Sequence, residues 1–169
     1  TWLSDQKMFF VSTAPLSGDG LINCSPKGTD SFRVLGDRRI AYLDMTGSGV
    51  ETIAHLKENR RIVIMFCAFE GAPKVFRFHG KRTVPELGSE GYRKRISHFI
   101  EYPGARSIIE IEVERISDSC GFTVPLYDFK EDRGTLQKWA ESKGPEGVAL
   151  YKREKNRQSV DGLPGLDLE

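Results

Sequence analysis

The sequence predicts a mainly β fold, a closed or split antiparallel barrel with flanking helices. The first observation is a series of five or six short apolar or alternating segments in the first two thirds of the 169-residue chain. The second is that tight turns join most of them, whereas an alternating parallel sheet needs a crossover helix between strands. The third is that helical patterns gather towards the C-terminus. Closing short antiparallel strands into a barrel also removes exposed sheet edges.

A β-hairpin is predicted near the start of the chain. Residues 7–14 are apolar and β-branched, and residues 17–20 (SGDG) form a concentrated turn signal. Residues 21–25 then alternate between apolar and polar side chains, as in a strand with one buried face. We expect Pro26 to break this second strand and residues 39–43 to form a third strand.

The middle of the chain predicts one helix followed by two strands. Residues 50–59 follow a glycine-rich loop and place their apolar side chains largely on one side, and Asn59 can end the helix. The most apolar stretch, residues 61–69, predicts a strand that is buried on both faces. Residues 74–84 alternate, and Gly80 within them suggests a bulge or a close backbone approach.

The last part of the chain predicts one more strand and then helices. The apolar spacing of residues 89–100 is that of an amphipathic helix. Residues 107–115 are predicted to form a half-buried strand, because they alternate strictly from Ile109 to Val113. The remaining expected segments are a short extended piece at 120–125, a short helix near Trp139, a more polar helix from Pro145 to about residue 157, and a draped tail.

The length fits one domain, in which we expect residues 7–115 to form the barrel and residues 116–169 to form a C-terminal helical extension. Lys and Arg total 25 and Asp and Glu total 24, and the resulting net charge of +1 leaves no basic footprint for nucleic acid. The longest apolar run, residues 62–69, is far shorter than the roughly 18–20 residues that span a bilayer. We therefore expect neither a nucleic-acid partner nor a membrane.

The three cysteines, Cys24, Cys67 and Cys120, are odd in number and widely spaced. This usage excludes a disulfide scaffold and a zinc ribbon, and it favours a reducing compartment, so we expect a cytoplasmic protein. No secretory signal pattern opens the chain, which begins at Thr1, and we expect further residues before it.

Two loops carry residue types that suit an anion. The first, Asn23-Cys24-Ser25-Pro26-Lys27-Gly28, ends a predicted strand and supplies a lysine charge suited to phosphate. The second, Thr46-Gly47-Ser48-Gly49, immediately precedes a predicted helix, whose N-terminus favours anions. The alternatives are an ordinary turn with a solvated lysine and a well-capped helix start. The glycine spacing fits neither a P-loop nor a dinucleotide fingerprint, but the two loops could clamp one anionic ligand from two sides.

The candidate nucleophiles and bases form no recognisable constellation. Cys67 lies within an apolar run, where we expect an inert buried thiol. His55 and His98 fall on predicted helices, where we expect surface or partly packed side chains. His79, on an alternating strand between two cations, is the histidine most worth testing. Because no spacing argues for a triad or a metal site, the sequence identifies no catalytic residue and no metal ligand.

Five motifs follow one another along the first half of the chain. They are residues 8–15 (MFFVSTAP), residues 22–28 (INCSPKG), residues 42–49 (YLDMTGSG), Glu51-Thr52 with His55-Leu56, and residues 61–71. In this order they resemble the pyridoxamine 5′-phosphate oxidase-like FMN-binding split-barrel family. The resemblance covers the barrel from Met8 to about Val84, and the later stretches 119–125, 139–147 and 156–165 look like signatures of a branch with its own C-terminal half.

The resemblance implies a six-stranded antiparallel split barrel that forms a homodimer with FMN at the subunit interface. The cofactor-binding residues that it implies are Asn23, Ser25, Lys27 and Gly28 in the first loop, with Thr46, Gly47, Ser48, Gly49 and Thr52 in the second. Flavin-dependent members usually carry an Arg-Lys pair where this chain has Glu51-Thr52. A carboxylate beside a phosphate is unfavourable unless Lys27 or another cation such as Arg77 compensates.

Three functions are consistent with these observations. The first is a flavin-dependent oxidoreductase that acts on a small redox substrate, in which the flavin N5 atom accepts or donates a hydride and no side chain need act as an acid or base. The second is a non-catalytic dimer that binds a flavin or another small ligand. The third is a dimer that has lost the cofactor. The absorption spectrum of the purified protein would separate them.

Overall fold

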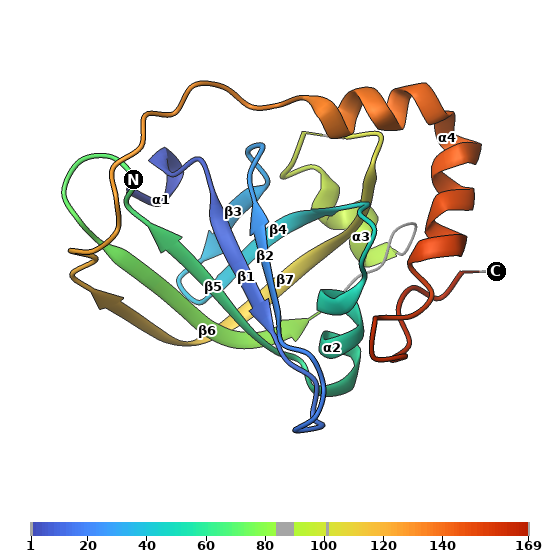
Figure 1. Ribbon diagram of the computed structural model, residues 1–169, viewed down its shortest axis with the longest axis horizontal. Helices are drawn as coiled ribbons and strands as arrows, with labels where there is room; N and C mark the ends of the chain where they lie inside the picture. Colours follow the sequence, from blue (N-terminus) through green and yellow to red (C-terminus); the bar gives the residue numbers. More distant parts are fainter. Residues whose placement is uncertain (1, 84–89, 101, 169) are drawn as a thin grey trace.

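The computed structural model describes residues 2–83, 90–100 and 102–168. Its elements are α1 (Trp2–Asp5), β1 (Phe9–Thr13), β2 (Asn23–Lys27), β3 (Phe32–Gly36), β4 (Arg39–Met45), α2 (Glu51–Asn59), β5 (Arg61–Cys67), β6 (Val75–Thr83), α3 (Glu90–Ile96), β7 (Ala105–Ser119) and α4 (Thr135–Lys155). In this part of the chain, seven strands form one antiparallel sheet in the order β2-β1-β5-β6-β7-β4-β3. Figure 1 shows the sheet strongly curled, with helices at its margins. The predicted mainly β class is confirmed, with seven strands in place of six.

The sheet curls until strands near its two edges meet. β2 and β3 are the edge strands, although they follow one another along the chain. Phe32 of β3 packs on Phe9 of β1, with ring centroids 5.5 Å apart, and on Phe66 of β5 at 4.9 Å. These aromatic rings fill the inside of the curl together with the aliphatic residues of the central strands. The result is a half-closed barrel around one main core.

The first hairpin forms as predicted, but Pro26 does not end its second strand. β2 continues to Lys27, and Pro26 lies opposite Phe10 of β1. An edge strand tolerates proline because the missing N–H can face away from the ladder. β3 has no counterpart among the strands predicted from the sequence; it pairs with β4 and is interrupted by a bulge between Val34 and Gly36.

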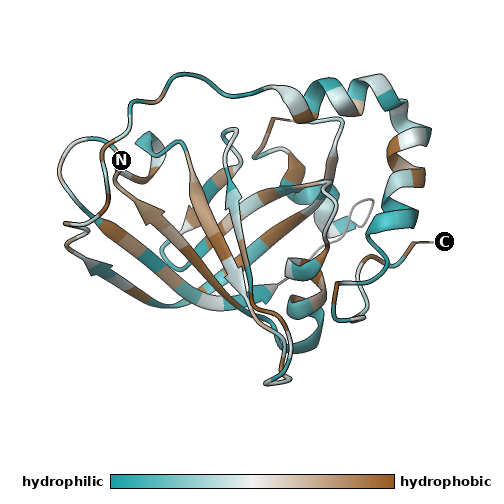
Figure 2. Cartoon of the chain, viewed as in Figure 1, coloured by the Kyte–Doolittle hydropathy of each residue, from teal (hydrophilic) through white to brown (hydrophobic). Residues whose placement is uncertain are grey.

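β5 and β6 lie near the centre of the sheet. Ile62, Ile64 and Phe66 of β5 are buried, but the residues between them are only partly covered. The prediction that β5 is buried on both faces is therefore wrong. Figure 2 shows the distribution of apolar residues along the strands of the sheet. The predicted irregularity at Gly80 is confirmed: the β6–β7 register shifts there, and a Cβ atom on Gly80 would overlap the Glu112 carbonyl oxygen.

The two helices within the barrel sequence cover different parts of the sheet. α2 buries Ile53 and Leu56 in the main core, and it ends where Arg60 adopts a left-handed conformation and donates its N–H to the Leu56 carbonyl. α3 is shorter than the predicted helix over 89–100, of which residue 89 lies outside the described residues. Tyr92 of α3 and the following Phe99 belong to a second apolar cluster on β4 and β7.

The C-terminal part of the chain wraps one side of the barrel. β7 continues to Ser119, and a long connection without regular structure, in which the expected piece at 120–125 forms no strand, leads to α4 (Figure 1). The two predicted helices are both present as halves of α4, joined at Gly144 in a non-helical conformation (φ 67°, ψ 171°). The tail after α4 lies beside α2 (Figure 1). Within the described residues, no helix has both the length and the apolar character needed to cross a lipid bilayer.

Candidate functional site

Alternate residues of β2 carry polar side chains toward the start of α2. Asn23 Nδ2 donates to Thr52 Oγ1 at 2.9 Å and to Thr13 Oγ1 at 3.2 Å. Ser25 Oγ donates to Asn23 Oδ1 at 2.9 Å. Because successive strand residues face opposite sides, Lys27 shares this face, and the residues between these three are exposed. The first predicted loop is thus a polar row along an edge strand.

His55 extends this polar row into the protein interior. Its Nδ1 atom lies 3.0 Å from Thr13 Oγ1, and the side chain is fully buried. The expectation of a surface or partly packed side chain is wrong for His55, because the helix turn that presents Thr52 and Leu56 to the barrel presents this residue as well. Within the described residues its Nε2 atom has no hydrogen-bond partner.

A buried ion cluster lies at the end of β4, just before the second predicted loop. Lys27 Nζ is 3.1 Å from Asp44 Oδ1, and Arg106 Nε is 2.6 Å from Asp44 Oδ2. Burial on its own would raise the pKa of Asp44, but the charges and hydrogen bonds of Arg106 and then Lys27 lower it to about 2. Asp44 therefore stays ionised at neutral pH. One negative charge against two positive charges leaves this cluster positive.

Arg106 and Asn156 also hold the glycine loop from its inner side. Arg106 Nη1 donates to the Gly49 carbonyl at 2.7 Å and to Asn156 Oδ1 at 3.1 Å. Asn156 Nδ2 donates to the Gly47 carbonyl at 2.9 Å. Asn156 is fully buried and directly follows α4, whose last turn accepts its backbone N–H. The conformation of the loop is therefore set by contacts with the C-terminal part of the chain.

The glycine loop keeps several hydrogen-bond donors unused. Within the described residues, the amides of Gly47, Ser48 and Gly49 make no hydrogen bond. The Thr46 hydroxyl is buried, and it too lacks a partner among those residues. Unused amides ahead of a helix N-terminus, with a positive cluster behind them, are suited to bind an anion. The residues present therefore fit a phosphate group.

Glu51 is the feature that opposes an anion at this loop. Its Oε1 atom accepts a hydrogen bond from the Val160 amide at 3.3 Å, and its carboxylate lies so close to Gly49 that a Cβ atom there would overlap it. Of the two cations named as possible compensation, Lys27 belongs to the ion cluster, whereas Arg77 donates to Ser119 Oγ at 3.2 Å. The positive charge beside the loop comes from the ion cluster around Asp44 and not from Arg77.

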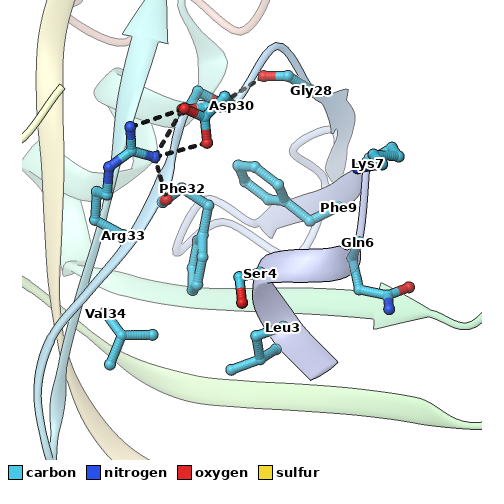
Figure 3. Close-up of a pocket in the computed structure, with 11 residues that line it drawn as sticks. Leu3, Ser4, Gln6, Lys7, Phe9, Gly28, Asp30, Phe32, Arg33 and Val34 are labelled. Atoms are coloured by element: carbon cyan, nitrogen blue, oxygen red, sulfur yellow. Dashed lines mark hydrogen bonds and ion pairs between the residues drawn. The ribbon is translucent and has the colours of Figure 1, made fainter. Parts of the chain in front are cut away.

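Gly28 lines a different hollow, of about 340 Å³, between α1 and the start of β3. Figure 3 shows Leu3 and Phe32 around it, with the ion pair of Asp30 and Arg33 at its margin. Of the predicted binding residues, the structure joins Asn23, Ser25 and Thr52 in one hydrogen-bonded row and places Lys27 beside the strand end that leads into Thr46, Gly47, Ser48 and Gly49. Gly28 lies apart from them.

Asp44, Arg106 and Asn156 are not among the site residues predicted from the sequence. Asp44 lies between an apolar strand and a glycine loop. Because ionisable residues are rarely buried without a partner, a carboxylate at that position could have been singled out from the sequence. Arg106 and Asn156 contact loop residues 57 and 109 positions away in the chain, so no local pattern could have found them.

Other chemistry finds little support in the structure. Within the described residues, no group of His, Cys, Asp and Glu side chains could hold a metal ion. Cys67 is buried, and burial raises the pKa of its thiol although Arg77 opposes this, as expected for an unreactive cysteine. The described residues also place no Cys, His and carboxylate together in a catalytic triad.

Two kinds of comparison identify the fold and the family. No family model matches the chain. Among solved structures, HupZ from Group A Streptococcus matches with a TM-score of 0.53 and 25% identity, over 70% of this chain and 89% of that one. A putative pyridoxamine 5′-phosphate oxidase from Lactobacillus delbrueckii matches with a TM-score of 0.51 and 18% identity, over 68% and 86% of the two chains. This likeness agrees with the predicted split barrel.

A sequence relative extends the comparison to the C-terminal part of the chain. The "Pyridoxamine 5'-phosphate oxidase family protein ustO" of Aspergillus flavus is 40% identical over 183 aligned positions, which cover 98% of this chain and 73% of the relative. A match of that extent includes α4 and the tail that hold the glycine loop. On the strength of this identity, the chain belongs to the pyridoxamine 5′-phosphate oxidase family.

Proposed function

We propose that the chain binds FMN, with the phosphate at the Thr46–Gly49 loop, and that it is a flavin-dependent oxidoreductase acting on a small redox substrate. The observation that carries the proposal is the buried positive cluster of Lys27, Asp44 and Arg106 behind a loop with unused amides. Membership of a family named for an oxidase supports the reaction class.

Each part of the site has a role in this proposal. The Thr46 hydroxyl and the amides of the glycine loop donate to phosphate oxygens, and Lys27 and Arg106 supply the compensating charge. The polar row that begins at Asn23 and Ser25 offers partners for the hydroxyls of the ribityl chain. A bound flavin would supply hydride transfer, so the protein has to bind and orient the ligand, and no acid or base is required of it.

We further propose that the working unit is a homodimer with the site between two copies. The polar row lies on an edge strand, and next to it Leu21 and Ile22 are 60% and 79% exposed. Exposed apolar side chains beside a site support a contact with a second subunit. The three cysteines are unpaired, which supports a reducing compartment, and we place the protein in the cytoplasm. Sedimentation velocity tests the dimer, and a monomer at micromolar concentration would contradict it.

The absorption spectrum and an FMN titration test the binding. We expect a yellow protein, or quenching of flavin fluorescence when FMN is added to the apoprotein. Addition of a nicotinamide donor should bleach the flavin, and air should restore its colour. A protein that remains colourless and leaves the fluorescence of added FMN unchanged would overturn the proposal.

The Glu51→Gln variant tests where the phosphate lies. Glutamine keeps an oxygen for the Val160 amide and removes the negative charge beside the loop. One unit of charge repulsion at about 4 Å in water is worth roughly 1 kcal/mol, so FMN affinity should rise about fivefold. Glu58→Gln is the matched control, because Glu58 also accepts a hydrogen bond from a backbone amide, that of Leu16, from the other end of α2. Equal effects of the two variants would show that the phosphate does not lie at the loop.

The same carboxylate favours a second candidate, a family member that has lost the cofactor. Glu51 occupies the space over Gly49 and is held there by the tail. If the wild-type protein ignores FMN and Glu51→Gln does so as well, this alternative replaces the first.

A further inference from the structure

A second hollow, of about 760 Å³, lies between α3, the turn that follows it and the half of α4 after the kink. This volume is within the range of small-molecule sites. Its wall is largely aromatic and aliphatic, formed by residues that include Tyr92, Tyr102, Pro145, Val148 and Ala149. Ala105 lines this hollow whereas its neighbour Arg106 reaches the glycine loop, because successive strand residues face opposite sides. The hollow is therefore separate from the proposed flavin site.

Lys152 is the buried polar group in this wall. The residue is only 6% exposed, and its Nζ atom donates to the Ala105 carbonyl at 2.9 Å. Among the described residues, no carboxylate lies within ion-pair distance of this ammonium. Asp167, which also lines the hollow, is bound to Lys57 at 2.8 Å. An ammonium has three protons, so two of them find no acceptor in the part of the chain that the structure describes.

The charges around Lys152 do not balance. Among the described residues, Asp44 is the negative charge that favours this ammonium, and Asp44 already pairs with Lys27 and Arg106. Burial first, and then the charge of Arg106, lower the pKa of Lys152 to about 8, while Asp44 acts in the opposite direction. The Lys152 ammonium is therefore a buried positive charge without a carboxylate of its own among the described residues, and an anion in the hollow would supply one.

We propose that this hollow binds a small organic acid, whose carboxylate contacts Lys152 and whose apolar body lies against Tyr92, Tyr102 and Val148. The carboxylate would accept the unused protons of the ammonium and neutralise its charge. The apolar wall would select for an aliphatic or aromatic body over a fully polar one. This site needs no flavin, and it stands whether or not the proposed function is correct.

Phenylacetate and its neutral amide, phenylacetamide, are the probes, titrated against the purified full chain by calorimetry. The two differ in charge and little in shape. A hydrogen bond to a charged group contributes roughly 1.5–3 kcal/mol of binding free energy. Phenylacetate should therefore bind at least tenfold more tightly than phenylacetamide at neutral pH. Equal affinities, or no binding of phenylacetate at millimolar concentration, would overturn the proposal. This comparison uses the wild-type protein and does not depend on the folding of any variant.

Two variants locate the binding. Lys152→Met should abolish the preference for the acid, and Lys155→Met is the control, since Lys155 is an exposed cation in the same turn that does not line the hollow. Ala149→Phe should fill the hollow and abolish binding of both probes while Lys152 stays in place. A preference that persists in folded Lys152→Met, or binding that survives Ala149→Phe, would place the acid elsewhere.

Discussion

Replacement of Asp44 by asparagine probes the ion cluster behind the glycine loop most directly. Asp44 is fully buried and bonded to both Lys27 and Arg106. Asparagine has nearly the same shape, so the change removes one negative charge and leaves two cations close together. We expect a marked loss of stability without loss of the fold.

The magnitude follows from the pKa of Asp44. Its decrease from 3.8 to about 2 corresponds to about 2–3 kcal/mol of stability at neutral pH. Removal of one partner from a buried ion pair generally costs about 3–5 kcal/mol. Asparagine keeps an oxygen for Arg106, and Lys27 is 19% exposed and can turn to water, so we expect about 2–3 kcal/mol.

Urea unfolding at pH 7, followed by the fluorescence of Trp2 and Trp139, measures this loss. The Asp37→Asn variant is the matched control, because Asp37 is exposed in the turn between β3 and β4. Its free energy of unfolding should stay within about 0.5 kcal/mol of wild type. A loss below about 1 kcal/mol for Asp44→Asn would refute the claim that the cluster stabilises the fold.

Acid titration gives an independent check of the same cluster. The folded pKa of Asp44 is lower than the unfolded value of 3.8, so its contribution is present above that value and is lost as the pH falls through about 2. The difference in stability between wild type and Asp44→Asn should therefore shrink between pH 4 and pH 2, as roughly set by these two pKa values. A constant difference over this window would show that the charge of Asp44 is not the cause.

Three further predictions concern the C-terminal part of the chain. Asn156→Ala should lower the free energy of unfolding by about 2–3 kcal/mol and weaken FMN binding, because the side-chain oxygen and nitrogen of Asn156 are both hydrogen-bonded in the interior. Unchanged FMN affinity in the folded variant would mean that the glycine loop keeps its conformation without Asn156. Raising the pH from 8 to 10.5 should stabilise wild type relative to Lys152→Met. The pKa of Lys152 is about 8 in the folded protein and 10.5 in the unfolded chain, so the folded protein loses its buried ammonium at a lower pH, and the cost of burying it disappears over this range. Melting temperatures measured across this range test the prediction, and parallel changes in the two proteins would contradict it. Gly144→Ala should destabilise by about 1 kcal/mol, because Gly144 has a φ of 67°; urea unfolding measures the loss, and an unchanged midpoint would show that the kink does not need glycine.

Local patterns predicted the elements well where one strand or helix has its own signal. The SGDG turn, the alternation on either side of Gly80 and the helix after Thr46–Gly49 all appear in the structure close to their predicted places. The prediction that Pro26 ends the second strand was wrong, because proline interrupts a central strand but is tolerated in an edge strand such as β2. Strand order is a property of the whole sheet, which no local pattern contains.

The glycine loop shows a similar division at the candidate site. Thr46, the glycines and Ser48 could be singled out because a helix follows them in the sequence. Whether these residues bind an anion depends on two charges of opposite effect. Arg106 of β7 favours an anion, and the carboxylate of Glu51, which is held by the tail, opposes one. Neither contact has a signal in the residues around the loop.

By itself, the sequence determined the mainly β class, the positions of most strands and helices, and the two loops with residue types that suit an anion. Those features depend on turn residues and on side-chain periodicity, which act within one element. Only the tertiary structure decided that Lys27, Asp44 and Arg106 form one buried cluster, that His55 is buried, and that Lys152 has no counter-ion among the described residues. The reason is that charges and hydrogen bonds in an interior act across space, between residues that folding brings together from distant parts of the chain.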